Sequence, residues 1–452
     1  MAITSCLGIQ SRCFADWASR PFKIKTQPDG EPLLTIALTI FATLVAVFIV
    51  ANFKTPEKEP HHKVEHLFGV QDPQLRREMG ILLGPAILPG NRILALQNGD
   101  EIFPAMLAAI RSAQCTITFE TFVYWSGSVG EEFAVALIER AQSGIRVHVM
   151  LDWVGTSKMP AELVARMKQA GIEVVRYHTV RWYNLGKLNN RTHRKVLVID
   201  GSLGFTGGVG IADEWLGHAQ DPQHRRDMHF KVEGPVVAQI QAAFLDNWIK
   251  TTGNVLHGHP YFPTIPSCGD QDMQMFISSP KGGSASMRLM YLAAITAAEH
   301  SIDIEAAYFV PDDLMSNELM GAQKRGVRVR IVLPDKHIDS QTVKIASKRE
   351  WGPLLECGIQ IYRYEPTMLH CKMLVFDRYL VSVGSTNFDM RSFELNDEAS
   401  LNIYDERFAA QMTEVFERDL RSSTAYTLEQ WRNRPLVQKF AETVLLPIRS
   451  QL

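Results

Sequence analysis

Two short stretches of the chain carry the same reactive residue types at the same spacing. Both read His-x-Lys-x-x-x-x-Asp, and the six residues are His193, Lys195, Asp200, His370, Lys372 and Asp377. Side chains alternate along a strand, so the His and the Lys of each stretch share one face. A titratable ring nitrogen beside a positive charge suits the cleavage of a phosphodiester. The two copies therefore predict two strands that face one shared site.

A glycine-containing turn follows each copy at the same distance. Residues 207–210 read Gly-Gly-Val-Gly, and residues 384–387 read Gly-Ser-Thr-Asn. Because glycine permits close approach of the backbone, we expect Gly208, Ser385 and Asn387 to contact a bound phosphate. The copies differ at the last position of the turn, where the first has glycine and the second has asparagine.

Four acidic residues are expected to position the histidines and lysines. Asp200 and Asp377 are expected to hydrogen-bond a His ring, which fixes its tautomer and stabilises its charged form. Glu120 and Glu305 occupy equivalent places in apolar runs that predict buried strands. A buried charge is costly unless it has a partner, so we expect both glutamates to face the site.

The doubled motif and its surroundings resemble the phospholipase D superfamily. Residues 226–235 and 389–398 narrow the resemblance to bacterial cardiolipin synthases, and the likeness extends from about Asn91 to the C-terminus. It implies that one His becomes phosphatidylated while the other protonates the departing alcohol, and it leaves open which His is the nucleophile. It also implies that Glu398 supports the site and that no metal or other cofactor is needed.

Helices and short apolar strands alternate in the same order through both halves of the chain. Several expected helices end at a glycine suited to a helix C-cap, namely Gly144, Gly171, Gly326 and Gly358. This alternation predicts an α/β fold with a mixed sheet flanked by helices. With the resemblance, it predicts two tandem phospholipase-D-like domains, at residues 91–263 and 264–452, that enclose one site.

The sequence before these halves predicts a membrane anchor. Residues 33–53 contain no charged residue, and about 20 such residues cross a bilayer core of about 30 Å. We expect a single transmembrane helix there, after an N-terminal tail at 1–32 and before a solvated linker at 54–90 that becomes helical around residues 73–79. A buried helix and a cleaved signal peptide are the alternatives. Positive residues on the two sides are tied in number, so the side of the membrane that holds the site stays open.

Charge and cysteine usage exclude some functions. A net charge of −2 gives no general attraction to nucleic acid, which disfavours a nuclease. The six cysteines show no spacing typical of a zinc site or a disulfide framework. Cys371 lies between His370 and Lys372 and is expected to point into a core.

The resemblance and the predicted anchor together imply a phosphatidyltransferase of the bacterial inner membrane. It would transfer a phosphatidyl group from phosphatidylglycerol to a second phospholipid through a phosphohistidine. We expect phospholipids and the membrane as partners and no nucleic acid, with the oligomeric state open. The alternatives are a phospholipase D-type hydrolase or a nuclease on the same site, and a catalytically silent membrane scaffold. Two intact motifs argue against the scaffold.

Overall fold

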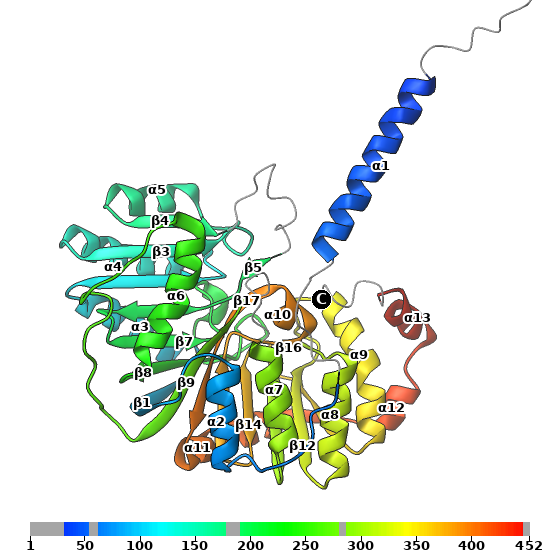
Figure 1. Ribbon diagram of the computed structural model, residues 1–452. Helices are drawn as coiled ribbons and strands as arrows, with labels where there is room; N and C mark the ends of the chain where they lie inside the picture. Colours follow the sequence, from blue (N-terminus) through cyan, green and yellow to red (C-terminus); the bar gives the residue numbers. More distant parts are fainter. Residues whose placement is uncertain (1–30, 54–61, 178–189, 280–285, 446–452) are drawn as a thin grey trace, which may run out of the picture. The chain divides into compact units, whose positions relative to one another are not determined.

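The computed structural model describes residues 31–53, 62–177, 190–279 and 286–445. Contacts divide the chain into two units, residues 1–51 and residues 52–452 (Figure 1). The predicted tail lies almost wholly outside the described residues.

Helix α1 (Glu31–Phe53) forms where the sequence predicted a membrane anchor. The side chains described on it, at 33–47, are all exposed. Among the described residues, no helix has both the length and the apolar character needed to cross a membrane. The predicted transmembrane helix at 33–53 is therefore not supported.

The second unit contains two halves with similar element order. The first half consists of α2 (Pro73–Leu82), β1 (Leu88–Gln97), α3 (Asn98–Ser112), β2 (Thr116–Thr121), α4 (Ser128–Gln142), β3 (Arg146–Asp152), α5 (Ala161–Gln169), β4 (Glu173–Tyr177), β5 (Arg191–Thr192), β6 (Val196–Ile199), β7 (Leu203–Gly207), η2 (Asp213–Trp215), β8 (Met228–Glu233) and α6 (Val237–Thr252). The second half consists of β9 (Gln271–Ser278), α7 (Ser286–Ala297), β10 (Ser301–Ala306), β11 (Phe309–Val310), α8 (Asp313–Lys324), β12 (Arg328–Pro334), α9 (Gln341–Glu356), β13 (Gln360–Tyr364), β14 (Lys372–Phe376), β15 (Leu380–Gly384), β16 (Phe388–Asp389), α10 (Met390–Glu394), β17 (Asn396–Tyr404), α11 (Glu406–Arg421), β18 (Ser423–Tyr426), α12 (Leu428–Arg432) and α13 (Leu436–Val444).

One mixed sheet runs through both halves. Its strand order is β18-β13-β12-β10-β14-β15-β17-β9-β1-β8-β7-β6-β2-β3-β4, and β5 pairs with β17 in addition. The halves join where β1 pairs with β9, in a register that sets Leu88 opposite Met273. The predicted α/β fold with a mixed sheet flanked by helices is confirmed. The predicted domain limit at 263/264 falls between α6 and β9 and stays a prediction.

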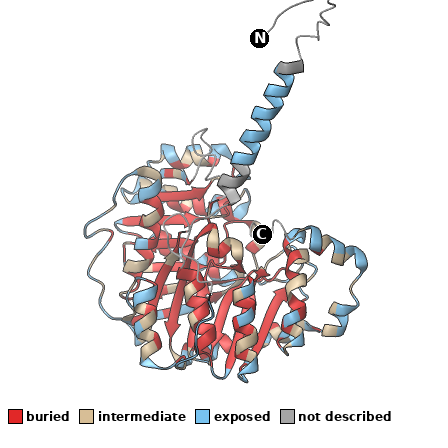
Figure 2. Ribbon diagram, turned by 45° about the vertical axis from the view of Figure 1, so that its right-hand side comes forward, coloured by how far each residue is buried: buried red, intermediate tan, exposed pale blue. Residues whose placement is uncertain are grey.

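Helices cover both faces of this sheet. Apolar side chains of α3, α4 and α5 pack on the first-half strands, and those of α2, α7, α8 and α9 pack on the second-half strands, in front of them in Figure 1. Helices α6 and α11 share one core with strands of both halves, including Val198 and Val375 on the two motif strands. The strands are buried while the outer helix faces are exposed (Figure 2). The shared core brings the two motif hairpins together.

Part of the predicted linker belongs to this folded unit. Leu75 and Met79, one turn apart on α2, are fully buried in the core formed with α7. His66 Nδ1 lies 2.8 Å from the carbonyl oxygen of Thr296. Residues 54–61 of the linker lie outside the described residues. The helix predicted around residues 73–79 is confirmed as α2, but its buried face shows that this part of 54–90 is not a solvated linker.

Candidate active site

The two motifs meet at one cavity of about 430 Å³. His193 and Lys195 lie at the start of the hairpin β6–β7, and His370 and Lys372 at the start of β14–β15. All four are buried, and both histidines line the cavity. An aromatic ring meets each imidazole edge-on: Phe122 at 5.1 Å from His193, and a tryptophan of η2 at 5.4 Å from His370. The shared site predicted from the doubled motif is thereby formed.

Each His ring is held by a carboxylate of the other half. His193 Nδ1 lies 3.0 Å from both carboxylate oxygens of Glu398 on β17. His370 Nδ1 lies 2.7 Å from Asp227 Oδ2, just before β8. A carboxylate at Nδ1 selects the tautomer that carries its proton there, so Nε2 of each neutral ring is left to react.

Backbone hydrogen bonds also connect each histidine to the other half. The N–H of His193 donates to the carbonyl of Asp397 at 2.9 Å, and the N–H of His370 donates to the carbonyl of Arg226 at 2.7 Å. Each acceptor immediately precedes the residue whose carboxylate holds the ring. Neither half therefore orients its own histidine.

The aspartates of the two motifs do not touch the rings. The Asp200 carboxylate accepts three consecutive N–H groups of residues 114–116 at 2.7–2.8 Å. Asp377 does the same with residues 299–301 at 2.8 Å. In an extended chain, each aspartate lies roughly 23 Å from the His of its own motif. The prediction that they orient the histidines is wrong, because they fix the far turns of the hairpins, where their φ angles are 51° and 50°.

The lysines fold back onto the residues that precede them. Lys195 Nζ donates to the carbonyl of His193 at 2.7 Å, and Lys372 Nζ to that of His370 at 2.6 Å. Burial lowers the pKa of Lys195 to about 7, with a contribution from the charge of Lys372. Burial likewise lowers the pKa of Lys372 to about 8. A bound phosphodiester anion favours the charged form of both side chains.

Burial favours the neutral form of both histidines. Burial, and to a lesser degree the charge of Lys195, lowers the pKa of His193 to about 4. Burial and the charge of Lys372 lower the pKa of His370 well below its ordinary value. Although burial acts to raise the pKa of Glu398, the neighbouring His193 and Lys195 hold it below its ordinary value. An ionised carboxylate therefore lies behind a neutral His193.

Of the three residues predicted to bind phosphate, only Asn387 lines the cavity. The Ser385 hydroxyl donates to Glu398 instead. At Gly208, the equivalent position, a Cβ would lie 2.2 Å from Asp227 Oδ1. Ser385 thus steadies one ring-holding carboxylate, and Gly208 leaves room for the other. Neither residue contacts the cavity as predicted.

Glu120 and Glu305 also lie away from the cavity. In the sheet they pair with Val196 and Met373, each of which directly follows a motif lysine. Consecutive strand residues face opposite sides, so both glutamates point away from the lysines. Burial raises their pKa values to about 7 and about 8. The prediction that they face the site is wrong.

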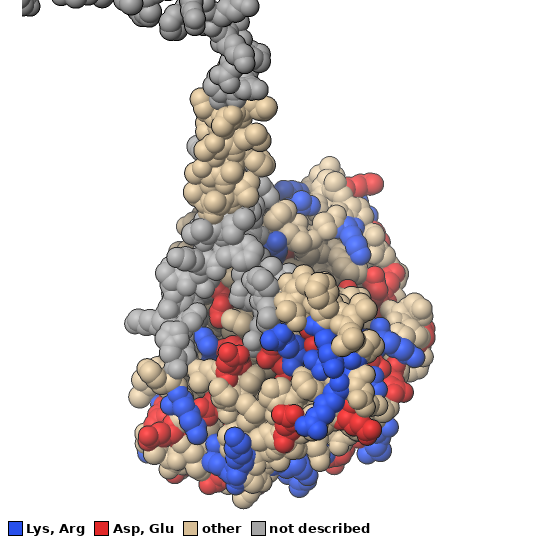
Figure 3. Space-filling model, turned by 90° about the vertical axis from the view of Figure 1, so that its right-hand side faces the viewer, with Lys and Arg blue, Asp and Glu red and all other residues tan. Residues whose placement is uncertain are grey.

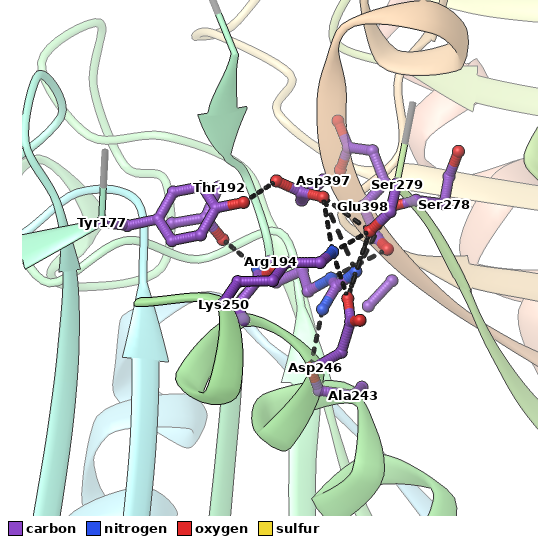
Figure 4. A network of polar contacts seen from close by, with 12 residues as sticks. Tyr177, Thr192, Arg194, Ala243, Asp246, Lys250, Ser278, Ser279, Asp397 and Glu398 are labelled. Carbon is purple, nitrogen blue, oxygen red and sulfur yellow. Dashed lines mark hydrogen bonds and ion pairs between the residues drawn. The ribbon is translucent and has the colours of Figure 1, made fainter. Parts of the chain in front are cut away.

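Polar clusters occupy the rear of both motif strands. Arg194, fully buried, points away from the cavity into the network of Figure 4. It donates to Asp246 Oδ2 at 2.9 Å and to the Ser279 hydroxyl at 2.9 Å. The hydroxyl groups of Ser279 and Tyr177 donate to Asp397 at 2.6 Å and 2.5 Å. This network fixes the segment that accepts the His193 N–H.

The second cluster contains groups able to ligate a metal. Glu305, Cys371 and Asp419 each place one ligand atom within 4.8 Å of the others. Arg226 already binds the Asp419 carboxylate, with NH2 2.9 Å from Oδ2. The positive charge that a cation would supply is therefore present. Cys371 is fully buried, as the sequence predicted.

Sequence reasoning did not assign Asp227 to His370. A signal was present, because an acidic residue follows each motif within a segment that resembles the family, Asp227 in 226–235 and Glu398 in 389–398. The cavity arginines Arg225 and Arg391 were also missed.

Comparison with known proteins agrees with this geometry. A family model described as "Cardiolipin synthase, PLD-like domain" matches residues 106–248 and 291–420. The chain belongs to this phospholipase D-like family. A cardiolipin synthase of Geobacillus kaustophilus (strain HTA426) is 34% identical over 377 residues, covering 83% of this chain and 75% of the relative. One of Geobacillus thermodenitrificans (strain NG80-2) is 31% identical over 431 residues, covering 95% and 82%. The protein is therefore an enzyme, a phosphatidyltransferase of the phospholipase D superfamily.

A solved structure supports the fold of this phosphatidyltransferase. Phosphatidylserine synthase of Haemophilus influenzae Rd KW20 superposes with a TM-score of 0.65, covering 84% of this chain and 98% of the other. The sequences are only 13% identical, so the likeness shows a common fold and no more. The prediction of the family from the doubled motif is confirmed.

Proposed function

We propose that the enzyme makes cardiolipin from two molecules of phosphatidylglycerol and releases glycerol. The observation that carries this proposal is a pair of histidines at one cavity, each oriented by the other half and each accompanied by a lysine. Such a pair supplies a nucleophile, a proton donor and positive charge for the phosphoryl oxygens. Relatives that cover most of the chain are named cardiolipin synthases.

In the proposed first step, Nε2 of His193 attacks the phosphorus of the donor lipid. Its Nδ1–H donates to Glu398, whose negative charge stabilises the imidazolium that forms with the P–N bond. The P–O bond to glycerol breaks, and protonated His370 gives its Nε2 proton to the departing oxygen. The substrate anion favours this protonated form. Lys195 and Lys372 balance the phosphoryl charge.

In the proposed second step, His370 acts as a base. It takes the proton from a hydroxyl of the second phosphatidylglycerol, and that oxygen attacks the phosphohistidine. The P–N bond breaks, and His193 returns to its neutral form. One phosphodiester replaces another, so the free-energy change is small and added glycerol reverses the transfer.

The competing functions differ in the acceptor or the substrate. A hydrolase would use water and yield phosphatidic acid. A nuclease would bind a polyanion, which the net charge of −2 disfavours. On the face drawn in Figure 3, basic and acidic side chains are interspersed. A silent scaffold would not require both His–Lys pairs in one cavity.

The test is the product ratio formed by the purified full chain in phosphatidylglycerol vesicles. We expect cardiolipin and glycerol in equal amounts, with little phosphatidic acid, and a net yield of cardiolipin that falls when glycerol is added. Mass spectrometry of the lipids measures cardiolipin and phosphatidic acid, and an enzymatic assay of the aqueous phase measures glycerol. Phosphatidic acid as the main product would establish the hydrolase, and cleavage of DNA without lipid turnover would overturn the proposal.

A further inference from the structure

A carboxylate and a guanidinium form an ion pair on the cavity wall beside His370. Arg225 NH1 lies 3.3 Å from Asp339 Oδ2, and the Tyr308 hydroxyl donates to Oδ1 of the same carboxylate. The Arg225 guanidinium lies over the Trp215 ring, 4.3 Å from its centre, and this ring meets His370 edge-on. All five residues line the cavity. A series of direct contacts therefore connects Asp339 to His370.

The Asp339 carboxylate is fixed in position and is accessible from the cavity. Its side chain is 34% exposed. Although burial acts to raise the pKa of Asp339, the charge of Arg225 and, to a lesser degree, that of His370 hold it below its ordinary value. An ionised carboxylate has about four acceptor positions, and Arg225 and Tyr308 use one on each oxygen. Each oxygen can therefore accept a further hydrogen bond from a bound hydroxyl group.

The equivalent loop of the first half offers an apolar side chain instead. Strands β3 and β12 hold equivalent places, each between two parallel neighbours. The loop after β12 supplies Asp339 and Ser340 to the cavity, and the loop after β3 supplies Val154. A second acid of the lining, Asp389, accepts the Ser392 N–H at 2.7 Å, and burial raises its pKa to about 7. Among the described residues that line the cavity, Asp339 is therefore the acid that is fully ionised at neutral pH.

We propose that Asp339 binds the middle hydroxyl of the glycerol unit that reacts beside His370. This inference rests on the proposed function, in which that place holds the departing glycerol in the first step and the glycerol headgroup of the acceptor in the second. A terminal hydroxyl is the reacting group, and its proton passes to Nε2 of His370 as its oxygen bonds to phosphorus. The middle hydroxyl donates to Asp339. A site built to bind a hydroxyl rejects an analogue that lacks it. Asp339 thus selects glycerol units over simpler alcohols.

The experiment measures how the phosphohistidine is divided between two alcohols. The purified full chain receives a phosphatidyl donor whose leaving group is p-nitrophenol, together with glycerol and 1,3-propanediol at equal concentrations. The two alcohols have the same primary hydroxyls and differ only in the middle hydroxyl. We expect the wild type to favour phosphatidylglycerol over phosphatidylpropanediol by about 10- to 100-fold, the usual effect of a hydrogen bond to a charged group. Mass spectrometry of the first products gives this ratio.

Removal of the carboxylate should abolish the preference for glycerol. D339A should bring the product ratio below about threefold, and D339N should give an intermediate ratio, because a neutral amide forms a weaker hydrogen bond. The matched control D335A removes a carboxylate of the same loop that pairs with Arg363, and it should keep the wild-type ratio. A product ratio does not depend on the amount of folded enzyme, so a variant that folds poorly still tests the subsite.

The outcomes separate the subsite from the proposed function. A wild-type ratio near one, or a ratio unchanged in D339A, would overturn the subsite. Equal loss of the preference in D335A would also overturn it, because the loop as a whole would then determine the choice of alcohol. A wild type that prefers glycerol but forms no cardiolipin in phosphatidylglycerol vesicles would refute the proposed function and support the subsite.

Discussion

The polar clusters behind the two catalytic histidines differ in which residue supplies the buried arginine. Behind His193, the arginine is Arg194 of the motif strand itself, and it lies 3.9 Å from Asp397 of the other half. Behind His370, the motif strand carries Cys371, and the arginine is Arg226 of the other half. Each cluster thus contains one buried arginine. It lies on the motif strand behind His193, and on the segment that accepts the histidine N–H behind His370.

This difference shows which features the site depends on. The buried arginine lies on the motif strand in one cluster and on the opposite segment in the other. The residue beside the ring-holding carboxylate also differs, being Ser385 at Glu398 and Gly208 at Asp227. The exchange between the halves is unchanged: Asp397 and Arg226 each accept the N–H of the opposite His, and the residue after each holds its ring. Two clusters of unlike chemistry therefore impose the same orientation on two rings for which we propose different steps.

The largest expected effect separates the roles of the two rings. H193A and H370A should each lower transfer by about 10²- to 10⁴-fold. A phosphatidyl donor with p-nitrophenol as its leaving group needs no proton donor, so it should restore the first step in H370A and not in H193A. Release of p-nitrophenol measures that step. Rescue of H193A instead would exchange the two roles.

A smaller loss is expected when the carboxylates become amides. E398Q and D227N should each lower kcat by about 10- to 100-fold, as loss of a group that orients a reactive ring does. The p-nitrophenol donor should rescue D227N and not E398Q, since each carboxylate acts through its own histidine. Equal behaviour of the two variants with this donor would show that the carboxylates serve the fold alone.

The pKa values of the two lysines predict how steeply kcat/KM falls as the pH rises. In the proposed mechanism, cationic Lys195 and Lys372 bind the phosphoryl oxygens, and their pKa values are about 7 and about 8. The pKa of His370, the proposed acid, lies well below its ordinary value, so kcat/KM should already fall with rising pH below 7, and loss of the lysine charges should steepen the fall past 7 and again past 8. K195R should remove the steepening at 7, and K372R the steepening at 8. A profile flat from pH 7 to 9 in the wild type would contradict charged lysines in substrate binding.

The smallest effect concerns the buried glutamates and appears in stability alone. Glu305 has a pKa of about 8 in the folded chain, above its value when unfolded, so the folded state binds more protons between about pH 5 and 8. Its contribution to stability is therefore lost as pH rises, by up to about 1.4 kcal/mol per pH unit.

E305Q cannot titrate and should flatten the dependence of unfolding free energy on pH up to 8, with transfer activity kept. E120Q should flatten it only up to about 7, the pKa of Glu120. Urea unfolding at several pH values measures both. An unchanged slope in E305Q would mean that this carboxylate is ionised when buried.

Local patterns in the sequence were enough to predict much of this structure. Strand alternation placed each His beside its Lys, and the helix–glycine–strand order gave the α/β fold. The aspartates misled because a carboxylate in a repeated motif was assigned to the motif's histidine, whereas it serves the adjacent turn. The true partner of His193 is 205 residues away, a pairing that no local pattern encodes. The prediction that Glu120 and Glu305 face the site was wrong because a buried acid can be protonated instead of being paired.

The exchange of partners between the halves also determines when the reactive pair can form during synthesis. His193 leaves the ribosome long before Glu398, and His370 waits for contact with Asp227, 143 residues earlier in the chain. Contacts so distant in sequence form late in folding, because long loops must close first. A nascent or truncated chain that ends before β17 therefore holds at most one ring in its working orientation. Both rings therefore reach their working orientation only in a chain that includes β17.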